Sequence, residues 1–376
     1  MPEKVSIITV LHGDKEFIPL IRDNYNRFLN KDDLELVIVD DGKKSLIKEF
    51  CDLDNLLYLH LNGEEVEKYN KEIIDNYKQP NKSLLYYEKK RGRLPDGFLR
   101  DYGCGMSSHD NIFHMNMDCI YNPKSIQRKL SFMKRVGAEC VFCDTTLAYD
   151  MYGKELYKTE SPFKIYESTL FHTREFWKRR GFQWSDTMNE GKAFHYDNGI
   201  DRKMDNYYDT VKLLNIRNVQ EYNPIALDLK KSEFTYEIKK DIIESIVMEY
   251  NPILDGIDSL FSDNQEIQVL GIHSEFIESL EDEKFKCNNL TDKIKQTKIS
   301  KEIKKINSSF HILLFGYKQP VWALFEEISF DCILLETSKN MEQMHSIIQN
   351  CKKFNYIYLN GMYINQSILK VPSQSE

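Results

Sequence analysis

The sequence lacks the features that would place the protein in a membrane or on nucleic acid. No window reaches the roughly 18 uninterrupted apolar residues of a membrane-spanning helix. The first ten residues lack the basic segment, apolar stretch and cleavage site of a secretory signal. The chain holds 51 Lys and Arg residues against 59 Asp and Glu, a formal net charge of −8, so it has no cationic excess for phosphate backbones. We therefore expect a cytoplasmic protein with no membrane span and no nucleic-acid partner.

The eight cysteines also lack the spacing of a disulfide framework or a zinc finger. Cys140 and Cys143 form a single CxxC, and no second such pair or paired histidines follow at zinc spacing. A chain of 376 residues can bury a large core without cross-links. We therefore expect reduced thiols, and we interpret Cys140 and Cys143 as ordinary strand residues.

The first third of the chain alternates apolar runs with amphipathic segments. The runs at residues 5–11 and 34–39 are apolar on both faces, and residues 16–29 place apolar side chains at helical spacing. This alternation is typical of parallel strands in a doubly wound α/β sheet. The same patterns predict strands at 56–61, 84–87, 111–117 and 139–143, and helices at 64–76, 98–108, 125–136 and 173–180.

The rest of the chain predicts a connector and a second domain. Residues 201–261 look mostly helical and polar, and 239–250 fit one long helix. The tail has four short apolar runs, at 268–272, 311–315, 331–335 and 356–359, with helical stretches at 291–306 and 341–351. We expect a helical connector over residues 229–264 and a smaller α/β domain over residues 265–376.

Acidic residues follow three of the expected strands. Asp40 and Asp41 end the second strand, Asp118 follows the run at 111–117, and Asp144 follows the run at 139–143. Ligands of open α/β sheets bind outside the carboxyl ends of the strands. A carboxylate there can bond a base or ribose or hold a divalent cation. One such Asp can equally cap a loop, but several together indicate a binding site.

Four motifs, in order, resemble family 2 glycosyltransferases of the GT-A fold. They are KVSIITV at 4–10, LELVIVDDG at 34–42, LRDYG at 99–103, and IFHMNMD at 112–118 with Pro123 after it. The family has a first strand of the form VSIIxPxYN, a strand ending in DDGS, an ARNxG helix start and a strand ending in DxD. The resemblance covers residues 4–180 well and 181–228 loosely, and it does not extend to the tail.

The resemblance implies a GT-A catalytic domain over residues 1–228, with a Rossmann-like, mostly parallel sheet. It implies transfer of a sugar from a nucleotide-diphosphate sugar, foremost a UDP-sugar, to a hydroxyl of a glycan or glycoconjugate, as in polysaccharide biosynthesis. Asp40 and Asp41 match the family's acidic pair at the nucleoside, and Val10 and Leu11 match the base pocket. Arg100 matches the arginine beside the diphosphate.

The DxD position carries a departure from the family. Asp118 matches the Asp that binds a metal ion, Mn²⁺ or Mg²⁺, between the two phosphates. Asn116 stands where the first Asp is usual. It can ligate through its amide oxygen or hold a ribose hydroxyl, but it adds no negative charge to a metal site. His195 is a candidate further metal ligand, with acceptor positioning and a turn as alternatives. His12 replaces the usual residues after the first strand and either touches the nucleotide or, as we favour, caps a turn.

The resemblance also implies an inverting reaction, which needs one general base to deprotonate the acceptor hydroxyl. Gly181 and Phe182 resemble the family's GGF, which precedes its acidic motif. We rank Glu190 first as the base and Asp186 second, and Asp209 stays open as a third. Trp184 with Tyr196 is a candidate platform for a sugar ring.

Some alternatives stay open. The basic run at 89–93 is interpreted as a solvated loop, or Arg91 or Arg93 helps to hold the diphosphate. The non-enzymatic alternative is a catalytically degenerate GT-A-like protein that binds or scaffolds in glycan assembly, which Asn116 keeps open. A nucleotidyltransferase is disfavoured, because the loop after the first strand has one glycine. The tail can serve acceptor binding, homo-oligomer formation or attachment to other glycan enzymes.

Overall fold

The computed structural model divides into two compact units, Met1–Gln79 with Gly92–Tyr250 and Pro80–Arg91 with Asn251–Glu376. It describes residues 3–76, 85, 88–89, 91–143, 145–151, 155–160, 167–185, 191, 201–204, 210–214, 225–227, 242–243, 246, 267–272, 285–289, 312–315, 330–335, 356–359 and 362–365. Within these ranges, no helix combines the length and the apolar character that crossing a membrane requires.

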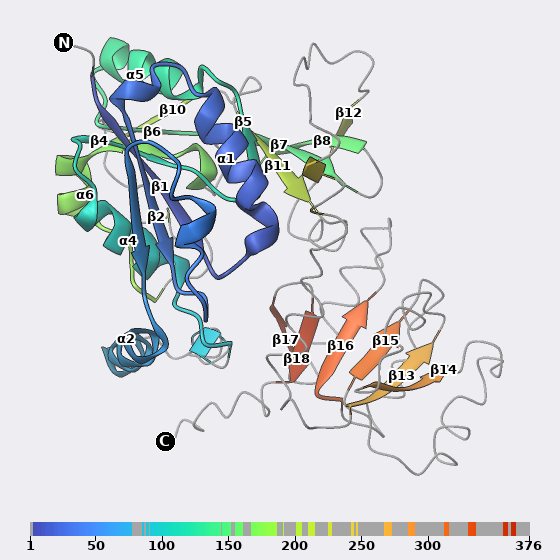
Figure 1. Ribbon diagram of the computed structural model, residues 1–376. Helices are drawn as coiled ribbons and strands as arrows, with labels where there is room; N and C mark the ends of the chain where they lie inside the picture. The colour runs from blue at the N-terminus through green and yellow to red at the C-terminus, as the bar shows by residue number, and fades with distance from the viewer. Residues whose placement is uncertain are drawn as a thin grey trace. The chain divides into compact units, whose positions relative to one another are not determined.

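The first unit is built on a seven-stranded sheet of order β10-β6-β9-β4-β1-β2-β3 (Figure 1). The strands are β1 (Val5–Leu11), β2 (Leu34–Asp40), β3 (Leu56–His60), β4 (Asn111–His114), β6 (Cys140–Phe142), β9 (Phe171–Thr173) and β10 (Asp201–Lys203). All neighbouring pairs are parallel except those of β9, which runs antiparallel to both β4 and β6. The expected mostly parallel α/β sheet is confirmed.

Helices cover both faces of this sheet, which explains why β1 and β2 are apolar along almost their whole length. The helices are α1 (Ile18–Arg27), α2 (Gly63–Asn76), α4 (Asp96–Met106), α5 (Ser125–Val136) and α6 (Arg174–Arg180). Figure 1 shows α1 and α5 on one side of the sheet and α4 and α6 on the other. All seven residues of β1 are buried, and the same is true of β2 except for Glu35.

Helix α4 lies unusually close to the sheet because of one glycine. A Cβ atom on Gly103 would lie 2.8 Å from Ile8 Cγ2 and 3.0 Å from Val39 Cγ2. The C-terminal end of α4 is held by Arg174, the first residue of α6. Its guanidinium donates to the carbonyl oxygens of Cys104 and Ser107, and the Cys104 carbonyl also accepts a bond from the Ser107 hydroxyl. These contacts fix the helix that carries Arg100.

A five-stranded sheet of order β12-β8-β7-β11-β5 completes the first unit. Its strands are β5 (Cys119–Tyr121), β7 (Thr145–Asp150), β8 (Glu155–Glu160), β11 (Thr210–Leu214) and β12 (Ile225–Leu227). The expectation that residues 201–261 are mostly helical is wrong for β10, β11 and β12, which are too short to show a clear period. Ile242, Ile243 and Ile246 are helical, inside the expected helix 239–250.

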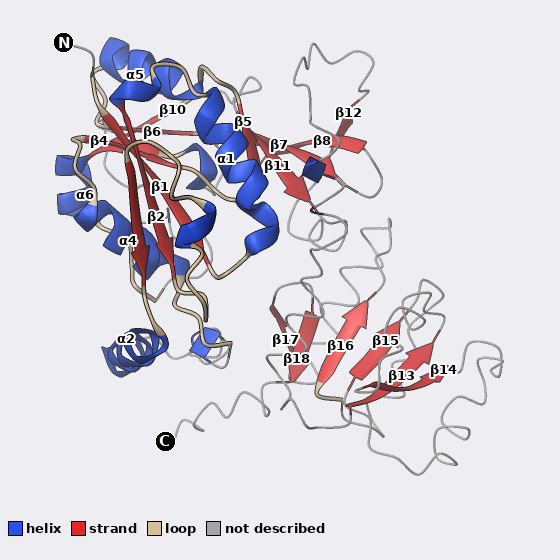
Figure 2. Cartoon of the chain, in the orientation of Figure 1, coloured by secondary structure: helices blue, strands red, loops and turns tan. Residues whose placement is uncertain are grey.

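The second unit contains a six-stranded sheet of order β14-β13-β15-β16-β18-β17 (Figure 2). Its strands are β13 (Ile267–Ile272), β14 (Phe285–Asn289), β15 (Ile312–Phe315), β16 (Cys332–Leu335), β17 (Tyr356–Leu359) and β18 (Met362–Asn365). The first four in the sheet order are parallel, and β18 is antiparallel to β16 and β17. The four expected strands are confirmed, whereas β14 and β18 were not expected. The helical stretches expected at 291–306 and 341–351 lie outside the described residues.

The other expected elements agree with the structure to different degrees. Helix α5 coincides with the expected 125–136, and α4 begins two residues before the expected 98–108. The run at 111–117 forms a strand only to His114. Leu85 is helical, so the strand expected at 84–87 is wrong there. Cys140 and Cys143 are buried free thiols, the first of them in β6.

Candidate functional site

The sheet order of the first unit changes direction at β1. From β1 the chain passes to β2 and β3 on one side, and it then returns to β4 on the other side of β1. Where strand connections diverge in this way, a crevice opens outside the carboxyl ends of the strands. The residues that leave β1, β2 and β4 at this edge are His12, Asp41 and Asn116 with their neighbours.

The side chain of Asp40 points into the two turns that follow β1 and β2. Its Oδ1 accepts hydrogen bonds from the backbone nitrogens of Gly13 (3.0 Å) and Gly42 (2.9 Å), and its Oδ2 accepts one from the Tyr58 hydroxyl. The carboxylate is fully buried. A Cβ atom on Gly42 would lie 2.5 Å from Gly13 Cα, so only glycine fits at this crossing of the two turns. Asp40 therefore fixes the shape of this edge.

His12 lies between two carboxylates. Its Nδ1 is 2.7 Å from Asp41 Oδ1, and its Nε2 is 2.8 Å from Asp96 Oδ1 at the start of α4. Burial alone would lower the pKa of His12, but the two carboxylates outweigh it and hold that pKa well above the usual value. Burial would raise the pKa of Asp96, yet the His12 imidazolium lowers it. His12 thus joins the β1 turn to α4 as a cation, a role beyond the turn cap that we favoured.

The basic loop before α4 is tied to the same edge. The backbone nitrogen of Leu94 donates to Asp41 Oδ2 at 2.5 Å. The Arg93 guanidinium lies 3.4 Å from Asp14 Oδ1, and the Arg93 carbonyl accepts a bond from Asn70 Nδ2. Arg93 is therefore not the solvated loop residue that we expected. Arg91 belongs to the second unit, where it pairs with Glu88 at 3.6 Å.

Arg100 and Asn116 are brought together. Arg100 Nη2 donates to Asn116 Oδ1 at 2.9 Å, and Nη1 lies 3.5 Å from His114 Nδ1. The arginine is almost completely buried, at 3% exposure. The Asn116 backbone nitrogen donates to the Tyr121 hydroxyl at 2.8 Å. The Asn116 amide therefore anchors a guanidinium.

Asp118 lies where β4 of the first sheet gives way to β5 of the second. Its side chain is 26% exposed, and Lys212 Nζ on β11 is 3.6 Å from its Oδ2. The Cys119 thiol donates to its Oδ1 at 3.4 Å. Val10 and Leu11, the expected base-pocket residues, are 8% and 0% exposed at the end of β1. Asp118 is therefore a partly accessible carboxylate with a cationic neighbour, Lys212.

Asp101 organises two tryptophans, which the sequence did not suggest. Its Oδ1 accepts bonds from Trp177 Nε1 (2.7 Å) and the Phe182 backbone nitrogen (3.1 Å), and its Oδ2 accepts one from Trp184 Nε1 (2.9 Å). Trp184 is 41% exposed and packs edge-to-face on Phe98 at 5.1 Å between ring centroids. A large aromatic surface is thus held open to solvent in a fixed orientation.

Two buried imidazoles lie behind Arg100. His114 Nε2 is 2.9 Å from His172 Nε2, and Cys104 Sγ is 3.9 Å from His114 Nε2. Burial lowers the pKa of His114 well below its usual value and that of His172 to about 4. Burial raises the pKa of the Cys104 thiol. The three groups are therefore neutral in the absence of a further ligand.

Several expected site residues lie outside the described residues. They are the base candidates Glu190, Asp186 and Asp209, the metal-ligand candidate His195, the platform residue Tyr196, and Asp144. Their roles stay predictions.

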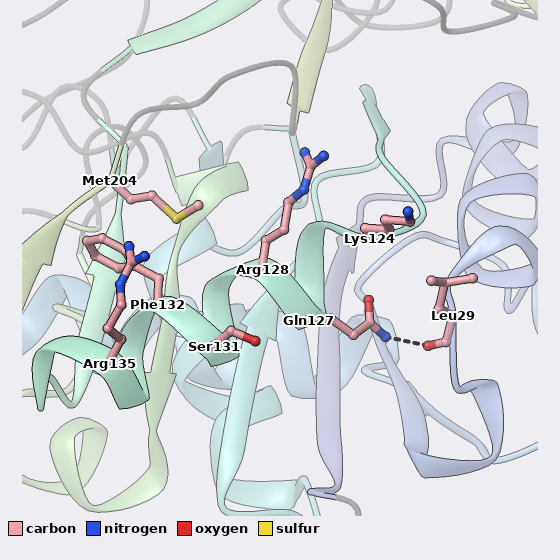
Figure 3. Close-up of a pocket in the computed structure, with 8 residues that line it drawn as sticks. All are labelled: Leu29, Lys124, Gln127, Arg128, Ser131, Phe132, Arg135 and Met204. Atoms are coloured by element: carbon pink, nitrogen blue, oxygen red, sulfur yellow. Dashed lines mark hydrogen bonds between the residues drawn. The ribbon is translucent and has the colours of Figure 1, made fainter.

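A separate hollow of about 470 Å³ lies on the outer side of α5 (Figure 3). It is lined by Leu29, Lys124, Gln127, Arg128, Ser131, Phe132, Arg135 and Met204. Its lining includes none of the residues at the carboxyl ends of β1, β2 and β4. It is therefore distinct from the candidate site described above.

A scan against protein-family models gives no match, and a search among curated proteins gives none either. Among solved structures, TarS of S. aureus (residues 1–349) is similar, with a TM-score of 0.38 and 11% identity over 56% of this chain and 60% of that one. Its UDP-GlcNAc complex has a TM-score of 0.38 and 10% identity over 56% and 59%. Its UDP complex has a TM-score of 0.38 and 12% identity over 58% and 62%. The chain thus spans about three fifths of these neighbours, a likeness too weak to assign an activity.

Proposed function

We propose that the protein is a GT-A-type glycosyltransferase that moves a sugar from a nucleotide-diphosphate sugar, foremost a UDP-sugar, to a hydroxyl of a glycan or glycoconjugate. The observation that carries the proposal is that Asp41 follows β2, Asn116 and Asp118 follow β4, and Arg100 is hydrogen-bonded to Asn116. The ordered motifs at 4–10, 34–42, 99–103 and 112–118 support it from the sequence.

The contacts suggest how the roles divide. Val10 and Leu11 form the nucleoside end of the site. Asp40 acts there as a positioning residue, because its carboxylate is occupied by Gly13, Gly42 and Tyr58. The Asp41 carboxylate, which bonds His12 and the Leu94 backbone nitrogen, must exchange one of these partners to reach the nucleoside. Arg100 is the cation for the diphosphate. Since its guanidinium is already oriented by Asn116, it needs little reorganisation when the negative charge of the leaving group grows.

A divalent cation fits Asp118. Mg²⁺-type ions are commonly held by one or two carboxylates together with substrate phosphates and water. Asp118 supplies one partly exposed carboxylate. The Asn116 amide oxygen is bonded to Arg100 and orients that cation rather than the ion. Such an ion, Mn²⁺ or Mg²⁺, would neutralise charge on the departing nucleoside diphosphate. The side chains of Lys212 and Arg100 supply further positive charge near the diphosphate.

Glu190 remains our leading general base, with Asp186 second. We propose a single displacement, in which the carboxylate accepts the acceptor's hydroxyl proton as the oxygen attacks the anomeric carbon and the nucleoside diphosphate leaves. Trp184 is the aromatic surface that we assign to the acceptor sugar, because it is exposed and held by Asp101.

Release of nucleoside diphosphate from a panel of nucleotide sugars, with and without Mn²⁺, tests the proposal. We expect turnover with at least one donor, and we expect Asp118→Ala to reduce it by about a hundredfold or more. Asp52→Ala is the matched control, because this exposed carboxylate pairs with Arg22 and precedes the start of β3 instead of following the carboxyl end of a strand.

Equal activity of wild type and Asp118→Ala would contradict the assigned site. If no donor is turned over but a nucleotide sugar binds and Asp118→Ala weakens that binding, the degenerate binding or scaffold protein is supported instead. If no donor is turned over and none binds, both the transferase and the degenerate binding or scaffold protein are overturned.

A further inference from the structure

Three groups that can ligate a metal meet inside the first unit. They are Cys104 on α4, His114 at the end of β4 and His172 on β9, and each is fully buried. Their nearest ligating atoms all lie within 4.8 Å of one another. The proposed transfer reaction uses none of them. Cysteine sulfur and imidazole nitrogen together are the donor set that zinc prefers.

The distances are close to those of a zinc site. With Zn–N bonds of about 2.0–2.1 Å and a Zn–S bond of about 2.3 Å, tetrahedral geometry places two nitrogens roughly 3.3 Å apart and nitrogen and sulfur roughly 3.6 Å apart. The two Nε2 atoms of His114 and His172 are 2.9 Å apart, and Cys104 Sγ is 3.9 Å from His114 Nε2. These two distances differ from the tetrahedral values by a few tenths of an ångström, and the Cys104 sulfur lies within 4.8 Å of the ligating nitrogen of His172.

The surroundings also suit a bound metal. Metal-ligating histidines usually donate their second ring nitrogen to a carbonyl or carboxylate, which fixes the tautomer. His172 does so, because its Nδ1 lies 3.0 Å from the carbonyl oxygen of Thr173. Its Nε2 therefore carries the lone pair and faces the cluster. The Phe182 ring packs edge-to-face on His114 at 5.1 Å, so the cluster has an apolar wall.

We propose that Cys104, His114 and His172 form a zinc-binding site that ties α4 to β4 and β9. The fourth ligand is a water molecule. On binding, the Cys104 thiol loses its proton to solvent, and the sulfur forms a bond to the ion. The proton on His114 Nε2, which now bridges to His172 Nε2, moves to His114 Nδ1. One proton is released per ion bound.

The tautomer change has a consequence for Arg100. Nη1 of Arg100 now lies 3.5 Å from His114 Nδ1, which is an acceptor in the metal-free chain. A proton on Nδ1 would repel that guanidinium N–H group, whereas the bond from Arg100 to Asn116 at 2.9 Å would be kept. Zinc thus bears on the orientation of Arg100 without touching any substrate.

Metal content and cobalt substitution of the full chain test the site. We expect about one zinc per chain after expression in zinc-supplemented medium. After exchange with Co²⁺, we expect strong tetrahedral d–d bands and a sulfur-to-cobalt charge-transfer band. A six-coordinate carboxylate and water site at Asp118 would give only weak d–d bands. Because the Cys119 thiol lies 3.4 Å from Asp118 Oδ1, the charge-transfer band must also persist in Cys119→Ser.

Variants separate the cluster from other thiols. Cys104→Ser and His172→Gln should each lower the zinc content by more than about tenfold and remove the charge-transfer band. Cys143→Ser removes another fully buried thiol and should change neither. Wild-type protein that binds no stoichiometric zinc, or that binds Co²⁺ without a charge-transfer band, would overturn the proposal, even if the variants fail to fold. Equal loss in Cys143→Ser would overturn it too.

Discussion

His12 Nδ1 lies 2.7 Å from Asp41 Oδ1, which joins the turn after β1 to the turn after β2 by a charged hydrogen bond. The same ring reaches Asp96 with its other nitrogen, so one imidazolium connects both turns to the start of α4. This connection places the expected nucleoside carboxylate in a fixed position. It also makes the stability of the edge depend on pH.

The pKa of His12 is raised in the folded chain, whereas an unfolded histidine titrates near 6.5. A raised folded pKa contributes stability that is complete below pH 6.5 and is lost as pH rises through the folded pKa. We expect His12→Gln to lower the free energy of unfolding by about 1.5–3 kcal/mol at pH 6, and by less as pH rises toward 9. Urea denaturation across this range measures the difference. A gap between wild type and variant that stays constant or widens with pH would contradict the assignment.

The crossing of Gly13 and Gly42 predicts a steric effect. A methyl group on Gly42 would lie 2.5 Å from Gly13 Cα, against backbone that cannot move aside. We expect Gly42→Ala to lower the free energy of unfolding by about 1–3 kcal/mol. Gly63→Ala is the matched control, because a methyl group there meets nothing within 4 Å. It should be neutral or stabilising by up to about 1 kcal/mol. Equal midpoints for the two variants in thermal denaturation would contradict the close approach of Gly42 to Gly13.

The main sheet was predictable from sequence because its long strands are apolar on both faces. Residues 5–11 and 34–39 show this directly, and the acids that follow them mark the carboxyl edge. The direction in which each acid points was not predictable. Asp40 and Asp41 are neighbours of the same type, yet one is turned into glycine turns and the other toward His12.

Contacts between distant segments were also beyond the sequence. Cys104, His114 and His172 have no motif spacing, and they meet only because β9 pairs antiparallel with β4. The two indoles on Asp101 converge for a similar reason, through α6 packing beside α4. Strands β10 and β12 have three residues each, which is too few to show a period.

Asp101 predicts a specific effect of an isosteric change. Asp101→Asn replaces one acceptor oxygen by an amide N–H₂ group, which then faces an indole N–H or the Phe182 N–H group. We expect a loss of about 1–3 kcal/mol in the free energy of unfolding, together with a changed tryptophan emission, because Trp184 loses its fixed orientation. In a Trp184→Phe background, the part of the emission change that comes from Trp184 should disappear, and the part that comes from Trp177 should remain. Unchanged emission and stability in Asp101→Asn would show that Asp101 does not hold the indoles.

Arg100 predicts a kinetic effect that rests on the proposed function. The two guanidinium nitrogens of Arg100 contact Asn116 and His114 simultaneously. The single ammonium group of a lysine cannot make both contacts. We expect Arg100→Lys to lower kcat/KM for the donor by about 10–100-fold, which corresponds to losing one charge-assisted hydrogen bond. Arg22→Lys is the control, because that arginine pairs with Asp52 on the surface. Equal kinetics for the two variants would remove Arg100 from the diphosphate site.

Lys212 predicts a change in metal affinity at Asp118. Its ammonium lies 3.6 Å from Asp118 Oδ2, where it competes with a divalent cation for the same carboxylate. Both side chains are about a quarter exposed, so solvent screens the pair. We expect Lys212→Met to tighten Mn²⁺ binding in the absence of donor by up to about fivefold, and to make the affinity less dependent on salt. Titration of Mn²⁺ followed by electron paramagnetic resonance measures both, with Asp118→Ala as the variant that should not bind. Weaker Mn²⁺ binding in Lys212→Met would mean that the lysine supports the ion site rather than competing with it.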